Sequence, residues 1–177
     1  MPAPDRTSLA EIVAAARDLL EAAGPAGVTM QAVAARVGVR APSLYKRVKD
    51  REALLVLVAE ANADELTRAL AASDRSLAAL AEAYRRFAHA RPEGFRQLIT
   101  IDADLAALGE VARPVLDAMG ELVGEEDALD AARLLVAWAT GFLTMELGGA
   151  FRLGGDVERA FAYGVTRILD GLAAPRG

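Results

Sequence analysis

The feature that most constrains this chain is the segment from Thr29 to Leu55, which holds two short helical patterns and a turn between them. Thr29 is a good N-cap residue, and apolar residues then recur at helical spacing as far as Val37. Gly38 stands where a helix of this length closes with a left-handed residue. Pro42 suits the first turn of a second helix, where its missing N–H costs nothing. The segment therefore predicts a helix-turn-helix, a motif whose second helix enters the major groove of DNA.

The charge distribution supports this interpretation. Residues 36–51 contain six cations and one anion, a net charge of +5, although the whole chain carries −5. Cations gathered on one small element of an acidic protein are typical of a phosphate-binding surface. The alternative is an ordinary solvated face, which is the commoner meaning of a charge run. The coincidence of the charge with the helix-turn-helix spacing favours DNA.

The same segment resembles the DNA-binding head of the TetR family of transcriptional regulators. That family's pattern appears here, in order, as Gly38-Val39, Leu44-Tyr45, Val48, Arg51-Glu52 and Leu54-Leu55. The chain departs from it in three places. Lys46-Arg47 replaces the usual His or Tyr pair, Val48 replaces Phe, and Arg51 replaces Lys. The departures bear on which operator is bound, because they add cations and leave the helical pattern intact.

The resemblance implies particular roles on DNA. Phosphates would be held by Thr29, Lys46, Lys49 and Arg51, and base edges would lie nearest to Arg40, Ser43, Tyr45 and Lys46. Arg40 is the best candidate for a bidentate contact to guanine. The recognition helix would run from Pro42 to Val48, and two such helices would enter major grooves ~34–36 Å apart on a roughly palindromic operator. A core position is the alternative for Tyr45.

Composition predicts an all-α protein. Apolar residues make up 54% of the 177 positions, alanine is abundant and only 5% are aromatic, which favours close-packed helices. The absence of cysteine excludes disulfides, zinc–thiolate sites and a cysteine nucleophile, and fits a reducing compartment. No signal-peptide pattern and no uncharged run of ~20 residues is present, so we expect a cytoplasmic protein without a membrane span.

The helical patterns predict about nine helices in two domains. Residues 1–50 would form a three-helix DNA-binding head, and residues 51–177 a ligand-binding and dimerisation body. A capping box at Ser8 and Glu11 opens a first helix that ends at Gly24-Pro25. A fourth helix runs from an Asp50 N-cap to about Ala72. Irregular structure is expected between Ile101 and Pro114, because proline disfavours helix at the residue before it.

The body contains a helix with almost no polar face. Residues 134–150 are apolar nearly all round, and burying such a helix in so small a chain calls for a second subunit. We therefore predict a homodimer with an interface at Gly141, Gly148, Gly149, Val157, Phe161, Val165 and Ile168. The run around Trp138 also resembles the body of one TetR subgroup with a Trp, a His-Gly pair and a Leu-Glu element. Thr140 stands where that His is usual, so the chain departs from the subgroup's pattern at this position.

Candidate chemistry in the body is sparse. Residues that would line a ligand pocket, each of which is by default a core residue, are Phe87, Phe95, Leu98, Val111, Leu116, Met119, Trp138, Phe142 and Met145. His89 is the single histidine and fits a position near a helix C-terminus. Acidic pairs such as Asp102 and Asp104 have no accompanying nucleophile, metal motif or phosphate loop, so no cofactor, metal or catalytic residue is predicted.

The residues and the resemblance together predict a transcriptional regulator. We expect a ligand-responsive homodimeric repressor whose partners are a double-stranded DNA operator and a small-molecule effector. Activation instead of repression fits the same residues, and the effector, the operator and the controlled genes have no signature in the sequence. Two other classes stay open: a helical ligand-binding or interaction module without DNA binding, and an all-helical enzyme.

Overall fold

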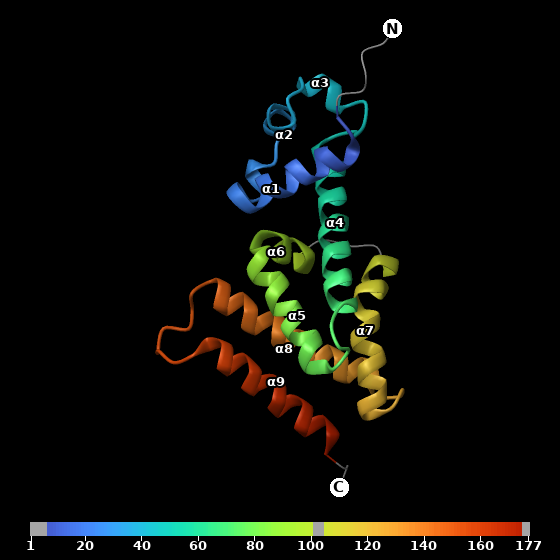
Figure 1. The fold of residues 1–177 in the computed structure, drawn as a ribbon, viewed down its shortest axis with the longest axis vertical. Coiled ribbons are helices and arrows are strands. Elements are labelled where there is room, and N and C mark those ends of the chain that lie inside the picture. Colours follow the sequence, from blue (N-terminus) through green and yellow to red (C-terminus); the bar gives the residue numbers. More distant parts are fainter. Residues whose placement is uncertain (1–6, 101–104, 175–177) are drawn as a thin grey trace. The chain divides into compact units, whose positions relative to one another are not determined.

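The computed structural model of the chain describes residues 7–100 and 105–174, and every regular element in these ranges is an α-helix. The nine helices, labelled in Figure 1, are α1 (Leu9–Gly27), α2 (Met30–Arg36), α3 (Ala41–Leu44), α4 (Arg51–Ala71), α5 (Leu77–Ala90), α6 (Pro92–Thr100), α7 (Leu105–Val123), α8 (Ala128–Leu147) and α9 (Val157–Ala173). The prediction of an all-α chain is confirmed.

Side chains cap three helices where the sequence analysis expects them, and Asp156 caps a fourth. Ser8 and Glu11 form the reciprocal capping box of α1, and the hydrogen bonds from Ser8 hold the pKa of Glu11 below its ordinary value. Thr29 accepts from Ala32 N at 3.1 Å at the start of α2, and Asp50 accepts from Ala53 N at 2.8 Å at the start of α4. Asp156 does the same for α9 through Arg159 N at 3.1 Å. Local chemistry therefore decides where these four helices begin.

One predicted helix boundary agrees with the structure and another is wrong. The regular helix from Leu9 is interrupted at Gly24 (φ 65°, ψ −175°), as predicted, and after this kink one more helical turn extends α1 to Gly27. The expected irregularity before Pro114 is absent from residues 105–114, where α7 runs through the proline. Residues 101–104 lie outside the described ranges. The conformational bias before proline is modest, and burial of residues such as Met119 on α7 outweighs it.

The chain divides into two compact units. The first contains residues 1–64 and 91–102, and the second contains residues 65–90 and 103–177. In the described ranges the first unit therefore holds α1, α2, α3, the first two thirds of α4, and α6. The grouping of α6 with the N-terminal helices has no counterpart in the sequence pattern. A functional boundary at residue 50 stays a prediction, since compactness does not decide which residues contact DNA.

The core of the first unit joins the three N-terminal helices to α4. Its buried members, each at most 3% exposed, include Ile12 and Leu20 from α1, Val33 from α2, Leu44 and Val48 from the α3 region, and Leu54 and Val58 from α4. Each helix supplies an apolar stripe of the predicted period. Packing of these stripes fixes the turn between α2 and α3 as one rigid piece.

The second unit is built around α8 and α9, which lie side by side and are joined by the loop 148–156 (Figure 1). Phe161 stacks on Trp138 with ring centroids 5.4 Å apart and meets Phe142 edge-on at 5.3 Å. A Cβ at Gly164 would stand 2.1 Å from Cζ2 of Trp138, so only glycine allows this approach of the two helices. Aromatic packing thus fixes α9 on α8.

Helix α8 is long and apolar enough to cross a membrane, a property that it shares with core helices of other proteins. Only 33% of its most apolar window is buried in the chain. The expectation of no membrane segment stays a prediction.

Candidate nucleic-acid interface

The predicted turn between the first two elements of the motif is present. Gly38 has φ 72°, the left-handed conformation that glycine adopts without strain, and Val39 N donates to Ala34 O at 2.9 Å to close the end of α2. The chain then enters α3 at Ala41, with Pro42 in its first turn. The spacing of Gly38 and Pro42 therefore has the local consequences that the sequence predicts.

The recognition element is shorter than predicted. Instead of a helix from Pro42 to Val48, α3 covers Ala41–Leu44 and a turn follows as far as Arg47. Arg47 N and Val48 N both donate to Leu44 O, at 2.8 and 2.9 Å. Leu44 and Val48 are buried, so the turn is anchored on the core at both ends. We call residues 41–49 the recognition segment.

The predicted DNA-contacting residues lie together on the outside of this segment and beside it. Thr29, Arg40, Pro42, Ser43, Tyr45, Lys46, Lys49 and Arg51 are all exposed. Tyr45 is 54% exposed, so it is not a core residue, and that alternative is excluded. Burial of Leu44 and Val48 turns the residues between them outward, because a helical turn has only one inner face. The geometry presents several cations and an aromatic ring on one surface.

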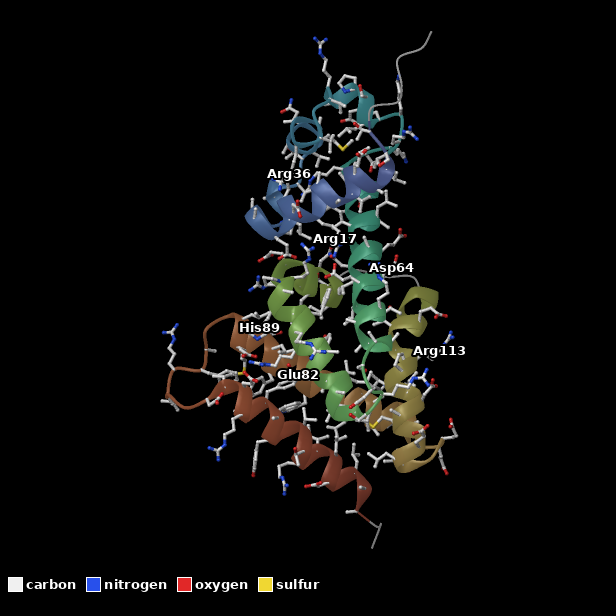
Figure 2. The ribbon with its side chains drawn as sticks, in the orientation of Figure 1. Arg17, Arg36, Asp64, Glu82, His89 and Arg113 are labelled. Carbon is white, nitrogen blue, oxygen red and sulfur yellow. The ribbon has the colours of Figure 1, made fainter. Side chains whose placement is uncertain are left out.

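Arg36 and Arg51, both in the basic window, make contacts within the protein. Arg36 donates to Asp18 Oδ2 at 3.0 Å, which joins α2 to α1, and Figure 2 shows its side chain on α2. Arg51 donates through Nε to Val28 O at 2.7 Å and through Nη2 to Pro25 O. Neither contact has a signal in the sequence pattern, because each partner lies 18 or more positions from its arginine.

A polar network that joins α1, α4 and α6 has no signal in the sequence pattern. Asn62 on α4 is 1% exposed; its Oδ1 accepts from Arg17 Nε at 2.8 Å and its Nδ2 donates to Gln97 Oε1 at 3.1 Å. Gln97 on α6 also donates to Leu55 O at 3.0 Å. Arg17 on α1 is labelled in Figure 2. Such a network predicts a defined register among α1, α4 and α6, because every buried polar group needs its partner.

The N-terminus of α6 is capped from α1. Both carboxylate oxygens of Glu21 accept backbone N–H groups from the first turn of α6, Oε2 from Glu93 at 3.0 Å and Oε1 from Gly94 at 2.9 Å. A carboxylate at this position satisfies two orphan donors and meets the positive end of the helix dipole. Only the folded chain brings these residues together, since 72 positions separate Glu21 from Glu93.

The nine predicted pocket residues do not form one group. Phe95 and Leu98 belong to the first unit and the other seven to the second. Phe87, Phe95 and Met119 are buried core residues, whereas Met145 is 49% exposed. A cavity of about 500 Å³ does open in the second unit, among α7, α8 and α9. Its lining is Leu122, Val123, Asp127, Asp130, Ala131, Leu134, Gly171, Leu172, Ala173 and Ala174, which includes none of the nine.

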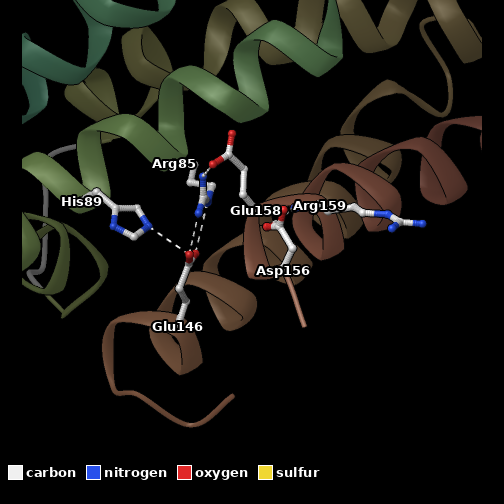
Figure 3. Close-up of polar contacts among 6 residues, drawn as sticks. All are labelled: Arg85, His89, Glu146, Asp156, Glu158 and Arg159. Carbon is white, nitrogen blue, oxygen red and sulfur yellow. Dashed lines mark hydrogen bonds and ion pairs between the residues drawn. The ribbon is translucent and has the colours of Figure 1, made fainter. Parts of the chain in front are cut away.

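A charged cluster links the helices of the second unit (Figure 3). Glu146 on α8 accepts from Arg85 Nη2 at 2.6 Å and lies 3.2 Å from His89 Nε2, and both partners come from α5. Burial alone would raise the pKa of Glu146, but the bonds from Arg85 and His89 outweigh it and hold that pKa below its ordinary value. His89 thus lies near the end of α5, as predicted, and additionally contacts a carboxylate. The cluster joins α5 to α8.

The predicted interface residues separate into several groups. Phe161 and Val165 are 2% and 4% exposed, so their side chains belong to the core of one chain and are not free for a partner. Gly148 is the C-cap of α8 and Gly149 has φ 66°, which gives both glycines a local role in ending that helix. Gly141 lies exposed in the middle of α8, with open space where a Cβ would stand.

The fold and this surface define the class of protein. An exposed cationic segment, held on a buried helix-turn-helix core and followed by further helices, is the architecture of a helix-turn-helix DNA-binding regulator. Within the described ranges, no group of three or more His, Cys, Asp or Glu side chains has metal-binding geometry.

Comparison with known proteins then identifies the family. The model for bacterial regulatory proteins of the tetR family matches residues 12–58, and that for the tetracyclin repressor-like C-terminal domain matches residues 77–168, over half of the 177 positions. The chain belongs to the TetR family and is a transcriptional regulator. The resemblance of the body to one subgroup stays a prediction.

Individual relatives agree with this assignment over most of their length. The tetracycline repressor protein class A from transposon 1721 of Escherichia coli is 29% identical over 201 residues, which cover 93% of this chain and 90% of that protein. Among solved structures, the transcriptional regulator SCO7222, a TetR from Streptomyces coelicolor, superposes with a TM-score of 0.74 at 22% identity, covering 94% and 98% of the two chains. A single-residue variant of TetR from Acinetobacter baumannii AYE in complex with minocycline gives 0.70 at 23%, covering 93% and 96%.

Proposed function

We propose that this regulator is a ligand-responsive repressor that binds a palindromic operator as a homodimer in the cytoplasm. The observation that carries the proposal is the recognition segment, where Tyr45, Lys46 and Lys49 are exposed between and beside the buried anchors Leu44 and Val48. Exposed cations on a rigid, apolar-anchored turn have their geometry set before DNA arrives, so little ordering entropy opposes binding.

The proposed division of labour on DNA follows from position and chemistry. Thr29, Lys46 and Lys49 would contact phosphates, which set affinity and register. Arg40, Ser43 and Tyr45 would meet base edges, with Pro42 at the start of the segment. Arg40 stands at the N-cap of α3, and its exposed guanidinium has the fork that matches O6 and N7 of guanine. A palindrome would follow from the two-fold symmetry of the dimer.

The proposed dimer face lies on α8. Leu134 and Met145 are 52% and 49% exposed and fall on the same side of a helix that is apolar nearly all round. Exposed apolar surface of this kind is costly in water and is typical of an interface. Gly141 on the same helix would let a second backbone approach closely, and Val157 and Ile168 on α9 are partly exposed and would lie at its edge.

The proposed effector is a small molecule bound by the second unit. The relative from Acinetobacter baumannii was solved with minocycline, but identity at this level carries the fold alone. An effector would bind more tightly to a state in which α4 holds the two heads at a spacing that does not match the operator. The population would shift toward that state, and the affinity for DNA would fall. No particular compound is proposed.

Salt dependence of DNA binding tests this function. We expect a pool of random duplexes to yield enriched sequences, and log Kd for them to rise steeply with log salt, with a slope near 0.9 per phosphate contacted. Lys46→Gln should lower that slope by about 0.9, the contribution of one phosphate contact. Flat salt dependence, or no enriched sequence, would favour a module that has lost DNA binding. Substrate turnover unaffected by Lys46→Gln and Arg40→Ala would instead revive the enzyme class.

A further inference from the structure

Arg51, the first residue of α4, directs its guanidinium at the junction between α1 and α2. Nε donates to Val28 O at 2.7 Å and Nη2 donates to Pro25 O. Val28 is the C-cap of α1 and itself donates to Pro25 O at 3.3 Å. Carbonyls at a helix C-terminus lack intrahelical partners and carry partial negative charge. A guanidinium is therefore a fitting cap for this helix end.

The contact joins the two ends of the DNA-binding surface. Val28 directly precedes Thr29, the N-cap of α2, and Arg51 follows Lys49 by two positions, at the end of the recognition segment. The apolar anchors Leu44 and Val48 hold the segment against the core, but apolar contacts are non-directional. Directional bonds from Arg51 add what those anchors lack, a fixed orientation of the end of the segment relative to α2.

Arginine suits this role and lysine does not. The guanidinium is planar and holds its donors in a fixed fork, so Nε and Nη2 meet two carbonyl oxygens together. A lysine ammonium carries the same charge as a point and has no fixed fork, so it does not impose one orientation on the two carbonyls. A phosphate contact, by contrast, is served by either cation, since lysine is itself a common phosphate ligand.

We propose that Arg51 is a positioning residue for operator binding, acting through the carbonyls of Pro25 and Val28 to hold the recognition segment at its working orientation. This role replaces the phosphate contact that the family resemblance assigns to Arg51. The proposal rests on the function proposed above for the segment. It predicts that geometry, and not charge, is what position 51 contributes.

The test compares Arg51→Lys with Lys49→Gln in the full-length protein. Binding is measured by fluorescence anisotropy on a duplex enriched by the wild type from a random pool and on an unrelated duplex of equal length, over a series of KCl concentrations. Circular dichroism selects a temperature at which each variant is folded. Arg51→Lys should lose about tenfold affinity for the enriched duplex, with less than about a twofold change on the unrelated one and an unchanged salt slope. Lys49→Gln should lower the slope by ~0.9 on both duplexes.

Three results would overturn the proposal. Wild-type affinity of Arg51→Lys for the enriched duplex would mean that charge suffices. An equal loss on both duplexes would mean that orientation is not involved. Failure of Arg51→Lys to fold at any temperature would assign the residue to stability alone. If the wild type enriches no duplex, the proposed function itself fails, and that outcome appears before any variant is made.

Discussion

Arg40 and Arg51 show how differently two arginines of one basic window are placed. Arg40 projects from the N-cap of α3, whereas the guanidinium of Arg51 bonds the carbonyl groups at the end of α1. The two residues have the same type and charge, so composition alone does not distinguish them. What separates them is the set of acceptors within reach, and this set comes from the end of α1, 23 positions away in the case of Val28.

Replacing Arg40 by alanine should change sequence preference more than overall affinity. We expect the loss of a bidentate contact to reduce discrimination by ~1–3 kcal/mol at one base pair in each half-site. Competition between the enriched operator and its single-base variants measures this. Arg36→Ala is the control, because Arg36 is also exposed but is paired with Asp18. If Arg40→Ala weakens binding to all sequences equally, Arg40 contacts a phosphate and not a base edge.

Glu146 gives the second unit an acid-sensitive contact. Its folded pKa lies below the ordinary 4.5, so its contribution to stability is complete above pH 4.5 and is lost as the pH falls through the folded value. Arg85 and Glu146 are 12% and 10% exposed, and Glu146→Gln should lower the free energy of unfolding at pH 7 by about 3 kcal/mol, since it removes the nearest and least exposed charge partner of Arg85. Urea unfolding from pH 7 to pH 3 measures both effects.

The matched control for that experiment is Glu158→Gln. Glu158 is 78% exposed and lies 3.9 Å from Arg85, so its replacement should change stability by less than about 0.5 kcal/mol. Equal effects of the two variants at pH 7, or an unchanged pH dependence in Glu146→Gln, would contradict the assignment of the acid-sensitive contact to Glu146.

At the scale of elements, α6 is the clearest case of a helix placed by tertiary contacts. Its own sequence predicts a short helix after Pro92 but says nothing of where it packs. Glu21 on α1 and Asn62 on α4 place it in the first unit, through its N-terminal amides and through Gln97. An element far along the chain thereby becomes part of the unit that contains the DNA-binding surface.

Glu21→Gln tests this placement. Glutamine keeps one carbonyl oxygen but loses the second acceptor and the charge at the N-terminus of α6, so we expect the first unit to lose ~1–2 kcal/mol. Amide exchange in α6 should quicken by a corresponding factor, as measured by hydrogen–deuterium exchange. Glu60→Gln, an exposed position on α4 with the same charge change, serves as the control. Unchanged exchange at Glu93 and Gly94 would show that the cap does not hold α6.

At the scale of the whole molecule, the main feature is the exposed apolar surface of α8, which a second subunit would bury. Gly141→Arg should break the proposed dimer, because the side chain would fill the space that lets a second helix approach. Within one chain the same change meets no neighbour and raises helix propensity by ~0.8–1 kcal/mol. Light scattering coupled to size-exclusion chromatography would show a halved mass for this variant.

The control is Gly109→Arg on α7, another exposed helical glycine with open space at Cβ. It adds the same charge and the same helix propensity away from the proposed face, and the mass should stay dimeric. A monomeric wild type, or a dimer that survives Gly141→Arg, would exclude this face of α8 from the interface.

The sequence by itself determined what depends on neighbours along the chain. Capping residues mark the starts of α1, α2, α4 and α9, Gly38 closes α2, and apolar periodicity distinguishes inside from outside in the helix-turn-helix. These signals act within a few residues, so a linear pattern contains all of their causes. The fold class and the exposed set around Tyr45 could be predicted for that reason.

Features that depend on partners far apart in sequence came from tertiary packing. It took Phe161 into the core through Trp138, placed α6 in the first unit through Glu21, kept α7 helical through Pro114, and paired the exposed Arg51 with two carbonyls. Each of these outcomes depends on packing between residues that lie far apart in the sequence. Helical spacing has a period of 3.6 residues and contains no information over that range, so packing had to supply it.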